Sequence, residues 1–435
     1  MSSPQLQIPA VRLPHPYLTA YTLHPAAAPL SYRLVLSTSQ PADATLPPQL
    51  LHNESLSFTL PATTQGAPSA DSDNTPYARA RRSLHSIIFW TAETTPTVGQ
   101  LWLLTYVLFT SYHAQETIRI TLSGPNSASL RKAALAAFLA LPHPFPTTPV
   151  IPYPDTSWST DELLLSRSTF WQGAGSPFGP RAAWVTDPST LLPTAPQVVE
   201  YTFTTKFPST RVYVRHPMRP CKPAPGSTVY SRWIPHLNEV FTMVAVDWRD
   251  AAHLDAFHTW QNDPHVSAGW NQSGPVEEHR KYLQDNEEDP HILSVLGSFD
   301  GELFGYFEVY WGAEDHLGAY YRFEDWDRGR HSLVGNRRLR GAHRVRAWWS
   351  GLMHYCFLDD SRTQRLVGEP RESNSVVAQY DRDHGFWHEG TVDLPHKRAH
   401  LAIVTRERFF KLAALHWGDE SGIEGERVKK VEAKL

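Results

Sequence analysis

The chain has 435 residues, which is enough for two or three domains with sizeable buried cores. Hydrophobic residues make up 41% and charged residues 19%, values that are typical of globular proteins and argue against a disordered or fibrous chain. The formal net charge of −4 gives no basic surplus, so we expect no nucleic-acid partner. Two cysteines, Cys221 and Cys356, are too few for a disulfide framework or a cysteine-rich zinc site, which favours a reducing compartment.

The two ends of the chain carry different targeting information. The start, Met1-Ser2-Ser3-Pro4-Gln5, lacks the charged and apolar regions of a secretory signal, and the longest apolar stretch, 101–109, is too short to span a membrane. The last residues, Ala433-Lys434-Leu435, are a variant of the Ser-Lys-Leu peroxisomal address and follow a charged, solvated stretch at 421–432. We therefore expect the peroxisomal import receptor as a partner and the peroxisome as location; a chance match would leave the protein in the cytoplasm.

Residues 1–230 are rich in Pro, Ser, Thr and Ala and poor in charge. Their alternating and apolar patterns predict a short helix and several strands. The strands are expected at 31–36, 57–60, 83–90, 198–204 and 211–215, the helix at 131–139 and a mobile loop at 66–74. No combination of residues in this half indicates chemistry. We interpret it as an N-terminal α/β domain of unknown role, with a diverged copy of the second half as one alternative.

A proline-rich connection separates the two halves. Residues 215–226 contain four prolines and a glycine, which is typical of an irregular linker. The predicted boundary lies at 225–235. A second domain is therefore expected over 231–418, followed by a flexible tail over 419–435.

The second half alternates strands and helices in a readable order, which places it in the α/β (α+β) class. Strands are expected at 241–246, 292–296, 304–311, 331–334, 365–369 and 401–404, and helices at 251–260, 276–286, 344–357 and 374–383. The Asp300-Gly301 dipeptide predicts a hairpin between two of these strands. Pro264 is expected to end the helical region that begins at Ala251.

Two motifs in this half indicate chemistry. The first is Arg338-Leu339-Arg340-Gly341-Ala342-His343-Arg344, between a predicted strand and a predicted helix. A helix N-terminus offers unpaired N–H groups, small residues let a phosphate approach the backbone, and arginine matches phosphate geometry. The motif therefore favours a pyrophosphate site, with an ordinary basic turn as the alternative. The second motif is Glu369-Pro370-Arg371-Glu372-Ser373-Asn374, where a strand ends in a carboxylate and Asn374 starts a helix that ends at Gly385-Phe386.

The order of these motifs resembles the GNAT N-acyltransferases, which bind acyl-CoA. More narrowly, four segments look like the siderophore-biosynthesis acyltransferases, which acylate the hydroxylamine of N-hydroxylated ornithine or lysine. These segments are 304–311, 327–335, 340–348 and 395–399. The resemblance covers roughly residues 240–412, and the length and the terminal tripeptide further resemble the fungal anhydromevalonyl-CoA:N5-hydroxyornithine transferases. It implies a GNAT fold in the second half and a hydroxamate-forming reaction in iron acquisition.

The resemblance implies roles for individual residues. Glu369 would be the general base, and His331 would orient the acceptor or share the proton. A backbone N–H near Leu333 or Val334 would stabilise the oxyanion, and Asn374 would contact the pantetheine arm. The coenzyme's pyrophosphate would be held by Arg338, Arg340, Gly341, Ala342, His343 and Arg344.

The acceptor site is expected on or after the aromatic strand. Its residues would be Glu308, Trp311, Asp315 and Tyr320, which could hold an ammonium and a carboxylate, although aromatic rows on strands are more often core. Two departures from the GNAT pattern stand out. His343 occupies a position that is usually small, and Asp381 occupies the position of the usual tyrosine acid, with Tyr380 one residue early.

Several alternatives stay open at this point. The donor is expected to be anhydromevalonyl-CoA, with acetyl-CoA and a hydroxylysine acceptor as alternatives, and a non-catalytic acyl-CoA-binding protein is a hypothesis from another class. The 22 histidines form no metal-binding motif, so no metal is expected. A homo-oligomer is compatible with the sequence.

Overall fold

The computed structural model describes residues 10–63, 76–91, 93–144, 162–179, 181–185, 199–204, 214–412 and 415. The predicted loop at 66–74 and the tail at 419–435 lie outside these residues, so the peroxisomal address stays a prediction. Within the described ranges, no helix combines the length and the apolar character that crossing a membrane would need.

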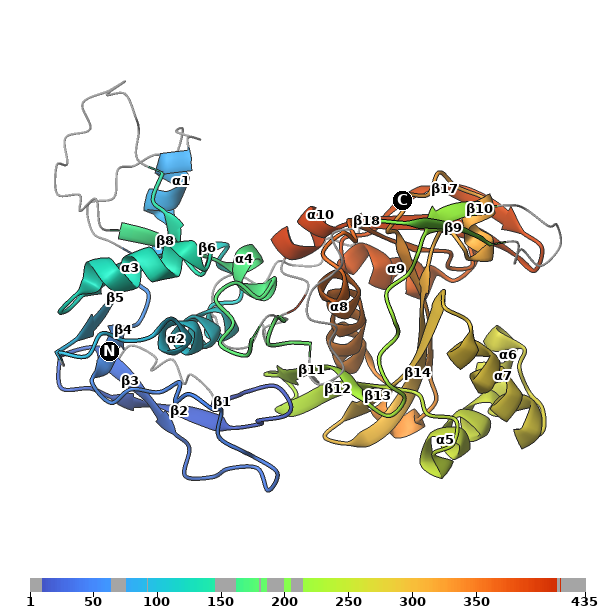
Figure 1. Ribbon diagram of the computed structural model, residues 1–435, viewed down its shortest axis with the longest axis horizontal. Helices are drawn as coiled ribbons and strands as arrows, with labels where there is room; N and C mark the ends of the chain where they lie inside the picture. The colour runs from blue at the N-terminus through green and yellow to red at the C-terminus, as the bar shows by residue number, and fades with distance from the viewer. Residues whose placement is uncertain are drawn as a thin grey trace, which may run out of the picture.

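Two eight-stranded sheets make up the framework, one in each half of the chain (Figure 1). The N-terminal sheet contains β1 (Val11–Arg12), β2 (Ala20–Pro25), β3 (Ser31–Leu36), β4 (Leu56–Thr59), β5 (Leu84–Trp90), β6 (Thr117–Ser123), β7 (Leu141–Pro142) and β8 (Glu162–Ser166). The C-terminal sheet contains β11 (Thr228–Ile234), β12 (Glu239–Ala245), β13 (Ile292–Phe299), β14 (Glu302–Trp311), β15 (Arg328–Val334), β16 (Arg365–Gly368), β17 (Trp387–Leu394) and β18 (Lys397–Thr405). A separate hairpin is formed by β9 (Tyr201–Thr204) and β10 (Val214–Pro217).

Both sheets have the same strand order. It runs β1-β2-β3-β4-β5-β6-β8-β7 in the first and β11-β12-β13-β14-β15-β16-β18-β17 in the second. In each sheet the fifth and sixth strands form the one parallel pair between described strands, and a helix connects them. That helix is α2 (Val98–Ser111) in the first half and α8 (Ala342–Asp359) in the second. The repeated topology agrees with the alternative that the N-terminal half is a diverged copy.

The remaining helices are distributed unequally between the halves. The first half contains α1 (Pro76–Arg82), α3 (Ser127–Ala136) and α4 (Arg167–Trp171). The second contains α5 (Ala251–Gln261), α6 (Pro264–Trp270), α7 (Val276–Glu288), α9 (Ser375–Asp383) and α10 (Arg406–Lys411). Three of these, α5 to α7, lie between the second and third strands of the C-terminal sheet, whereas β2 and β3 are joined by a short turn.

One helix boundary differs from the sequence-based expectation. The helix α5 does end before Pro264, at Gln261, but the proline then opens a further helix instead of a loop. Asp263 caps that helix by accepting a hydrogen bond from the His265 N–H at 2.8 Å, and Pro264 takes the first helical position, where its missing N–H costs nothing.

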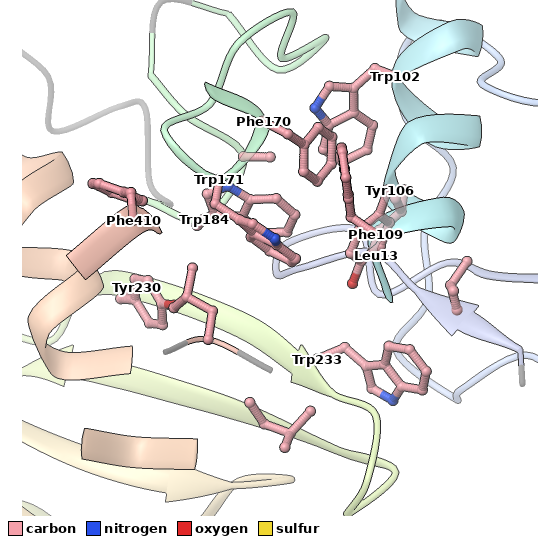
Figure 2. Packing of buried hydrophobic residues seen from close by; sticks show 14 of the residues in the cluster. Leu13, Trp102, Tyr106, Phe109, Phe170, Trp171, Trp184, Tyr230, Trp233 and Phe410 are labelled. Carbon is pink, nitrogen blue, oxygen red and sulfur yellow. The ribbon is translucent and has the colours of Figure 1, made fainter. Parts of the chain in front are cut away.

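An aromatic core runs without interruption from one sheet to the other (Figure 2). Trp102 of α2, Trp171 of α4 and Trp184 lie at its centre, and the ring centroids of Trp171 and Trp184 are 4.4 Å apart. On the C-terminal side His354 contacts both halves, because its Nε2 donates to the Trp171 carbonyl at 2.6 Å and its Nδ1 accepts from the Tyr230 hydroxyl at 2.9 Å. Burial holds the pKa of His354 well below its usual value, so the ring is neutral. The two halves therefore share one buried core.

The C-terminal sheet opens between its two parallel strands. The β15–β16 ladder has two rungs, Arg328↔Leu366 and Gly329↔Val367, and the strands then diverge. Beyond the end of β15 the chain turns through 337–341 into α8, and Gly341 adopts a φ of +134° at the helix N-cap. This left-handed conformation is accessible to glycine and strained for other residues. The open strands and this helix end define the site described next.

Candidate active site

A cavity of about 580 Å³ lies where β15 and β16 diverge. Its wall combines residues from the sheet, from the helices α6, α7 and α9, and from the turn between β17 and β18. The cavity contains Glu308, His331 and Glu369 together with Asp315 and Asn374. Five of the residues expected at the site from the sequence therefore share one cavity.

Glu308, His331 and Glu369 form a continuous hydrogen-bonded row. His331 Nε2 lies 2.8 Å from Glu369 Oε1, and His331 Nδ1 lies 3.0 Å from Glu308 Oε2. The row follows from the strand register, because Glu308 of β14 pairs directly with His331 of β15. Glu369 comes immediately after β16 and reaches the histidine from the other side of the opening. Both ring nitrogens of His331 are thus occupied by carboxylates.

Each carboxylate has further donors. Glu369 Oε2 accepts from the Tyr310 hydroxyl at 2.9 Å, and Lys397 Nζ lies 3.4 Å from Glu369 Oε1. Glu308 Oε1 accepts from the hydroxyls of Tyr282 and Tyr306 at 2.6 and 2.8 Å and from Asn286 Nδ2 at 3.3 Å. A carboxylate has about four lone-pair sites. Among the described residues, Glu308 Oε1 has three donors, whereas the Oε2 of each carboxylate has one, His331 for Glu308 and Tyr310 for Glu369. Each Oε2 therefore keeps an acceptor site, and both carboxylates line the cavity.

The row carries a positive charge between two negative ones. Burial alone would lower the pKa of His331, but the carboxylates of Glu369 and Glu308 outweigh it and raise that pKa to about 10. Burial alone would raise the pKa of Glu369, but the His331 imidazolium, with Lys397 and the Tyr310 hydroxyl, holds it well below its usual value. The pKa of Glu308 is lowered against its burial in the same way. At neutral pH the row therefore consists of an imidazolium between two carboxylates.

The N-terminus of α8 forms the other end of the site. Gly341 caps the helix without a side-chain hydrogen bond, followed by Ala342 and His343, so the first N–H groups keep their capacity to bind an anion. Arg338 and Arg344 flank this end and form ion pairs with Glu302 and Glu239. Arg340 is arranged differently, since its guanidinium donates to the Val334 carbonyl at 2.9 Å.

The backbone of β15 separates the two expected oxyanion donors. Gly335 N–H donates to the Phe304 carbonyl across the β14–β15 ladder. Because N–H directions alternate along a strand, the Leu333 N–H points toward β14 as well, and the Val334 N–H points toward the open side. The Val334 carbonyl confirms this direction, because Arg340 binds it from outside the ladder. Of the pair expected from the sequence, Val334 has the N–H that faces the opening.

Of three other residues predicted for the site, two line the cavity and one does not. Asn374 lines the cavity, but its side chain also caps α9 by accepting from the Val377 N–H at 3.1 Å. Asp315 lines the cavity and lies between His291 and His316, at 3.8 and 3.2 Å. Tyr320 is 39% exposed and lies outside the cavity lining.

Trp311 was expected to hold the acceptor, and the structure places it elsewhere. Its ring lies between the guanidinium groups of Arg219 and Arg328, each 4.4 Å from the ring centroid. Glu308 belongs to the hydrogen-bonded row and Tyr310 donates to Glu369, and these two residues are two positions apart, so the alternation of a strand sends Trp311 to the opposite face. That rule was available from the sequence, and it also identifies Tyr310, which sequence reasoning missed.

Other cavity residues were missed because no local pattern marks them. Lys397 is the first residue of β18, Tyr282 is on α7 and Trp270 ends α6, so each reaches the site through tertiary packing. Trp270 packs edge-on against His331 with ring centroids 6.3 Å apart. Across the described residues, no cluster of three or more His, Cys, Asp or Glu side chains could hold a metal ion.

Comparison with known proteins adds independent information. The acetyltransferase (GNAT) domain family matches residues 249–394. The chain is 45% identical to the hydroxyornithine transacylase SID3 of Ajellomyces capsulatus, over 93% of this chain and 94% of that one. It is also 45% identical to the N(5)-hydroxyornithine:cis-anhydromevalonyl coenzyme A-N(5)-transacylase SIDF of Beauveria bassiana, over 93% and 92%. An Escherichia coli N(6)-hydroxylysine O-acetyltransferase is 36% identical over 45% of this chain and 60% of its own.

The open parallel strands, the uncapped helix end and these relatives together define an acyl-CoA-dependent N-acyltransferase. The chain belongs to the GNAT siderophore acyltransferases, the family that includes the two hydroxyornithine transacylases. The GNAT fold expected for the second half is confirmed.

Proposed function

We propose that this enzyme transfers an anhydromevalonyl group from coenzyme A to the hydroxylamine nitrogen of N5-hydroxyornithine and so forms a hydroxamate for siderophore biosynthesis. The observation that carries the proposal is the Glu308–His331–Glu369 row in the cavity between β15 and β16. The names of the two relatives that match over nearly the whole chain support the substrates.

The weak basicity of Glu369 favours a hydroxylamine as the acceptor. A lysine-type amine, with a pKa near 10, is cationic at neutral pH, and a carboxylate whose pKa is held below its usual range cannot deprotonate it. A hydroxylamine is far less basic and arrives neutral. After its nitrogen attacks the thioester, the cationic nitrogen of the adduct is acidic enough for such a carboxylate. The free lone-pair site on Glu369 Oε2 is where this proton would go.

His331 acts on this base and does not compete with it. Both its ring nitrogens are held by carboxylates, so it has none free to accept a proton from the acceptor. Its positive charge lies beside Glu369 and fixes the orientation of that side chain. Glu308, whose other oxygen is saturated by three donors, holds the histidine in place. In this arrangement His331 and Glu308 are positioning residues.

The thioester and the rest of the coenzyme would lie along the opening between β15 and β16. The Val334 N–H would donate to the carbonyl oxygen as it becomes an oxyanion. The pyrophosphate would lie on the N–H groups of Gly341, Ala342 and His343, where the helix dipole is favourable. Arg338 would turn from Glu302, an exposed ion pair that costs little to break, and add its charge.

The amino-acid end of the acceptor needs one anionic and one cationic contact. Asp315 lines the cavity and would bind the α-ammonium group. Arg371, His396 and Lys397 line the same cavity and would bind the α-carboxylate. Acetyl transfer to hydroxylysine is the second candidate, since the Escherichia coli relative is named for that chemistry.

A panel of two donors and three acceptors tests the proposal. Anhydromevalonyl-CoA and acetyl-CoA are each incubated with N5-hydroxyornithine, N6-hydroxylysine and ornithine, and thiol release is followed together with the iron(III) colour of the hydroxamate. We expect the highest kcat/KM for anhydromevalonyl-CoA with N5-hydroxyornithine and no transfer to ornithine. A preference for acetyl-CoA would establish the second candidate, and thiol release without any acceptor dependence would contradict both.

A further inference from the structure

The connection between the two halves contains a buried ion pair that the mechanism above does not use. Figure 1 shows this connection running along the C-terminal half from β10 to β11. In it, Arg219 donates from Nε and Nη2 to the two carboxylate oxygens of Glu314, each at 2.5 Å, and both side chains are 2% exposed. Burial alone would raise the pKa of Glu314, but Arg219 and His216 hold it below its usual value. A forked pair between an arginine and a carboxylate fixes orientation as well as distance, so the connection holds Glu314 in one place.

Further contacts fix Arg219 itself. Its Nη1 donates to the Asp325 carbonyl at 2.6 Å. Its guanidinium lies over the rings of Trp311 and Trp326, with the central carbon 4.4 and 5.3 Å from their centroids. The segment 312–327 joins β14 to β15, and Arg219 therefore contacts this segment near both of its ends.

The ion pair lies next to the residue that we assign to the ammonium group of the acceptor. Glu314 directly precedes Asp315, which lines the catalytic cavity and has 8% of its side chain exposed. Asp315 Oδ1 accepts from the Leu317 N–H at 2.9 Å, whereas Oδ2 lies 3.8 Å from His291 Nε2, beyond hydrogen-bond distance. Oδ2 therefore keeps the capacity to accept a hydrogen bond from a ligand.

The same connection supports Asp315 from a second direction. Lys222 donates from Nζ to three carbonyls at the turn between α7 and β13, among them that of Asp289 at 3.0 Å. In this turn His291 Nδ1 lies 2.7 Å from Asp289 Oδ1, and the other side of the ring faces Asp315. Burial alone would lower the pKa of His291, but the two aspartates outweigh it and raise that pKa to about 9. One imidazolium between two carboxylates leaves one net negative charge, which an ammonium group would balance.

We propose that Arg219 is a positioning residue for the acceptor, which fixes Glu314 so that the carboxylate of Asp315 is placed to bind the α-ammonium group. This role rests on the proposed function, since the ammonium group is assigned to Asp315 there. Without Arg219, Glu314 would be a buried carboxylate deprived of its main partner, and such a charge is stable only where water reaches it. Because Asp315 is the next residue, its backbone would move with Glu314. The irregular connection between the halves would thus take part in substrate selection.

Acceptors that lack one end of the amino acid separate this positioning from a general structural effect. The compound 5-(hydroxyamino)pentanoic acid is N5-hydroxyornithine without its α-amino group, and N-hydroxy-1,4-diaminobutane is the same molecule without its carboxyl group. For the original enzyme we expect the loss of the α-amino group to lower kcat/KM about 10- to 100-fold, the size of a hydrogen bond to a charged group.

Substitutions of Arg219 should act only on acceptors that carry the ammonium group. Arg219→Gln should lower kcat/KM about tenfold for N5-hydroxyornithine and for the diamine, and leave kcat/KM for the pentanoic acid and the Kd of coenzyme A within about twofold. Arg219→Lys keeps the charge without the fork and should have an intermediate effect. The matched control is Arg215→Gln, because Arg215 of β10 is exposed and lies over the Tyr201 ring. It should leave all of these values unchanged.

A double variant shows whether Arg219 acts through Asp315. Asp315→Asn should reproduce the selective loss, and its combination with Arg219→Gln should lose no more than Asp315→Asn alone. Additive losses would overturn the proposal, as would an equal loss in Arg219→Gln for acceptors with and without the ammonium group. It is also overturned if the original enzyme does not distinguish these acceptors. If Arg219→Gln does not fold, Arg219→Lys decides: a loss confined to acceptors with the ammonium group supports the proposal, and any other result contradicts it.

The result can be separated from that of the panel of donors and acceptors. If the panel identifies N6-hydroxylysine as the acceptor, the same comparison uses 6-(hydroxyamino)hexanoic acid, so the hydroxyornithine assignment can fail while the role of Arg219 stands. An original enzyme that turns over neither hydroxylamine contradicts the proposed function and this role together. Turnover without the selective loss in the Arg219 variants contradicts this role alone.

Discussion

The two sheets share one strand order, yet only the C-terminal one has an opening between its parallel strands. In that sheet β15 and β16 are joined by two rungs, whereas β5 and β6 of the N-terminal sheet are joined by six. Trp90 closes the N-terminal pair, because its indole Nε1 donates to the Pro125 carbonyl at 3.1 Å and its ring covers Gly124. A Cβ at Gly124 would lie 2.5 Å from that ring, so no carboxylate could take the place that Glu369 has after β16.

The helix that follows the fifth strand also differs between the two halves, because its N-terminal N–H groups are capped in the first half and left free in the second. The α2 N-terminus is closed by a capping box, in which Thr97 and Gln100 satisfy each other's backbone N–H groups. The α8 N-terminus begins at Gly341 and has no side-chain cap. The comparison teaches that topology alone does not make a coenzyme site. The strands must separate, and the helix end must keep its donors free. The N-terminal half meets neither condition and contributes to the shared core instead.

The largest expected effect comes from a substitution that removes activity in the C-terminal half and leaves the N-terminal half unchanged. Glu369→Gln removes the proposed base and should lower kcat about 10²- to 10⁴-fold, while the Kd of coenzyme A measured by calorimetry stays within about twofold. Glu372→Gln is the matched control, because Glu372 is exposed and pairs with Arg398 away from the cavity. Full activity in Glu369→Gln would show that the base has been assigned to the wrong residue.

The next effect tests whether the two halves are one folding unit. Trp184→Ala empties the centre of the aromatic core and should reduce the free energy of unfolding by about 3–5 kcal/mol. Because the core is continuous, denaturant unfolding followed by circular dichroism and by loss of activity should give coincident transitions at a lower midpoint. Separate transitions for secondary structure and activity would mean that the N-terminal half stabilises the C-terminal half less than the shared core implies.

The next effect, which develops gradually with pH, concerns the positive charge of the Glu308–His331–Glu369 row in the C-terminal half. The pKa of His331 is raised from 6.5 to about 10 on folding, so its contribution to stability is complete below pH 6.5 and is lost as the pH rises through 10. Over this window the free energy of unfolding should fall by up to about 1.4 kcal/mol per pH unit. His331→Gln should flatten that slope in urea titrations, whereas the exposed His265→Gln should not.

The smallest effect concerns the coenzyme end. Arg338→Ala should raise the KM for acyl-CoA about three- to tenfold without changing kcat, because an exposed charge contributes about 1 kcal/mol. The increase should shrink at high salt. Arg398→Ala removes a comparably exposed charge that pairs with Asp393 and should leave KM unchanged. An equal rise in both variants would indicate a general effect of net charge.

Much of the C-terminal fold could be predicted because its local signals agree with its packing. The Asp300-Gly301 turn is one case: both residues have the positive φ that this dipeptide predicts, 43° and 82°, and the hairpin of β13 and β14 follows. The α2 helix is the opposite case. It is buried on nearly every side, so its residues are apolar all round and show no helical periodicity.

The candidate site was predictable where a residue belongs to a strand or a motif. Glu308, His331 and Glu369 lie at strand positions whose register brings them together. Lys397 and Trp270 could not be found in this way, because only the tertiary fold brings the start of β18 and the end of α6 near the cavity. The absence of an opening between β5 and β6 depends on Trp90 and Gly124, which no sequence pattern marks.

The final helix, α10, has a consequence for how the molecule is made. Arg167 of α4 donates from Nη2 to the Lys411 carbonyl at 2.8 Å, across 244 residues of chain, and buried Arg232 binds the Leu415 carbonyl at 2.5 Å. A ribosome releases the N-terminal half long before these acceptors exist. Arg167 Nη2 and the aromatic surface of the N-terminal half, and Arg232 at the start of the C-terminal half, must therefore wait for these partners until synthesis is nearly complete, which makes the nascent chain a natural client for chaperones.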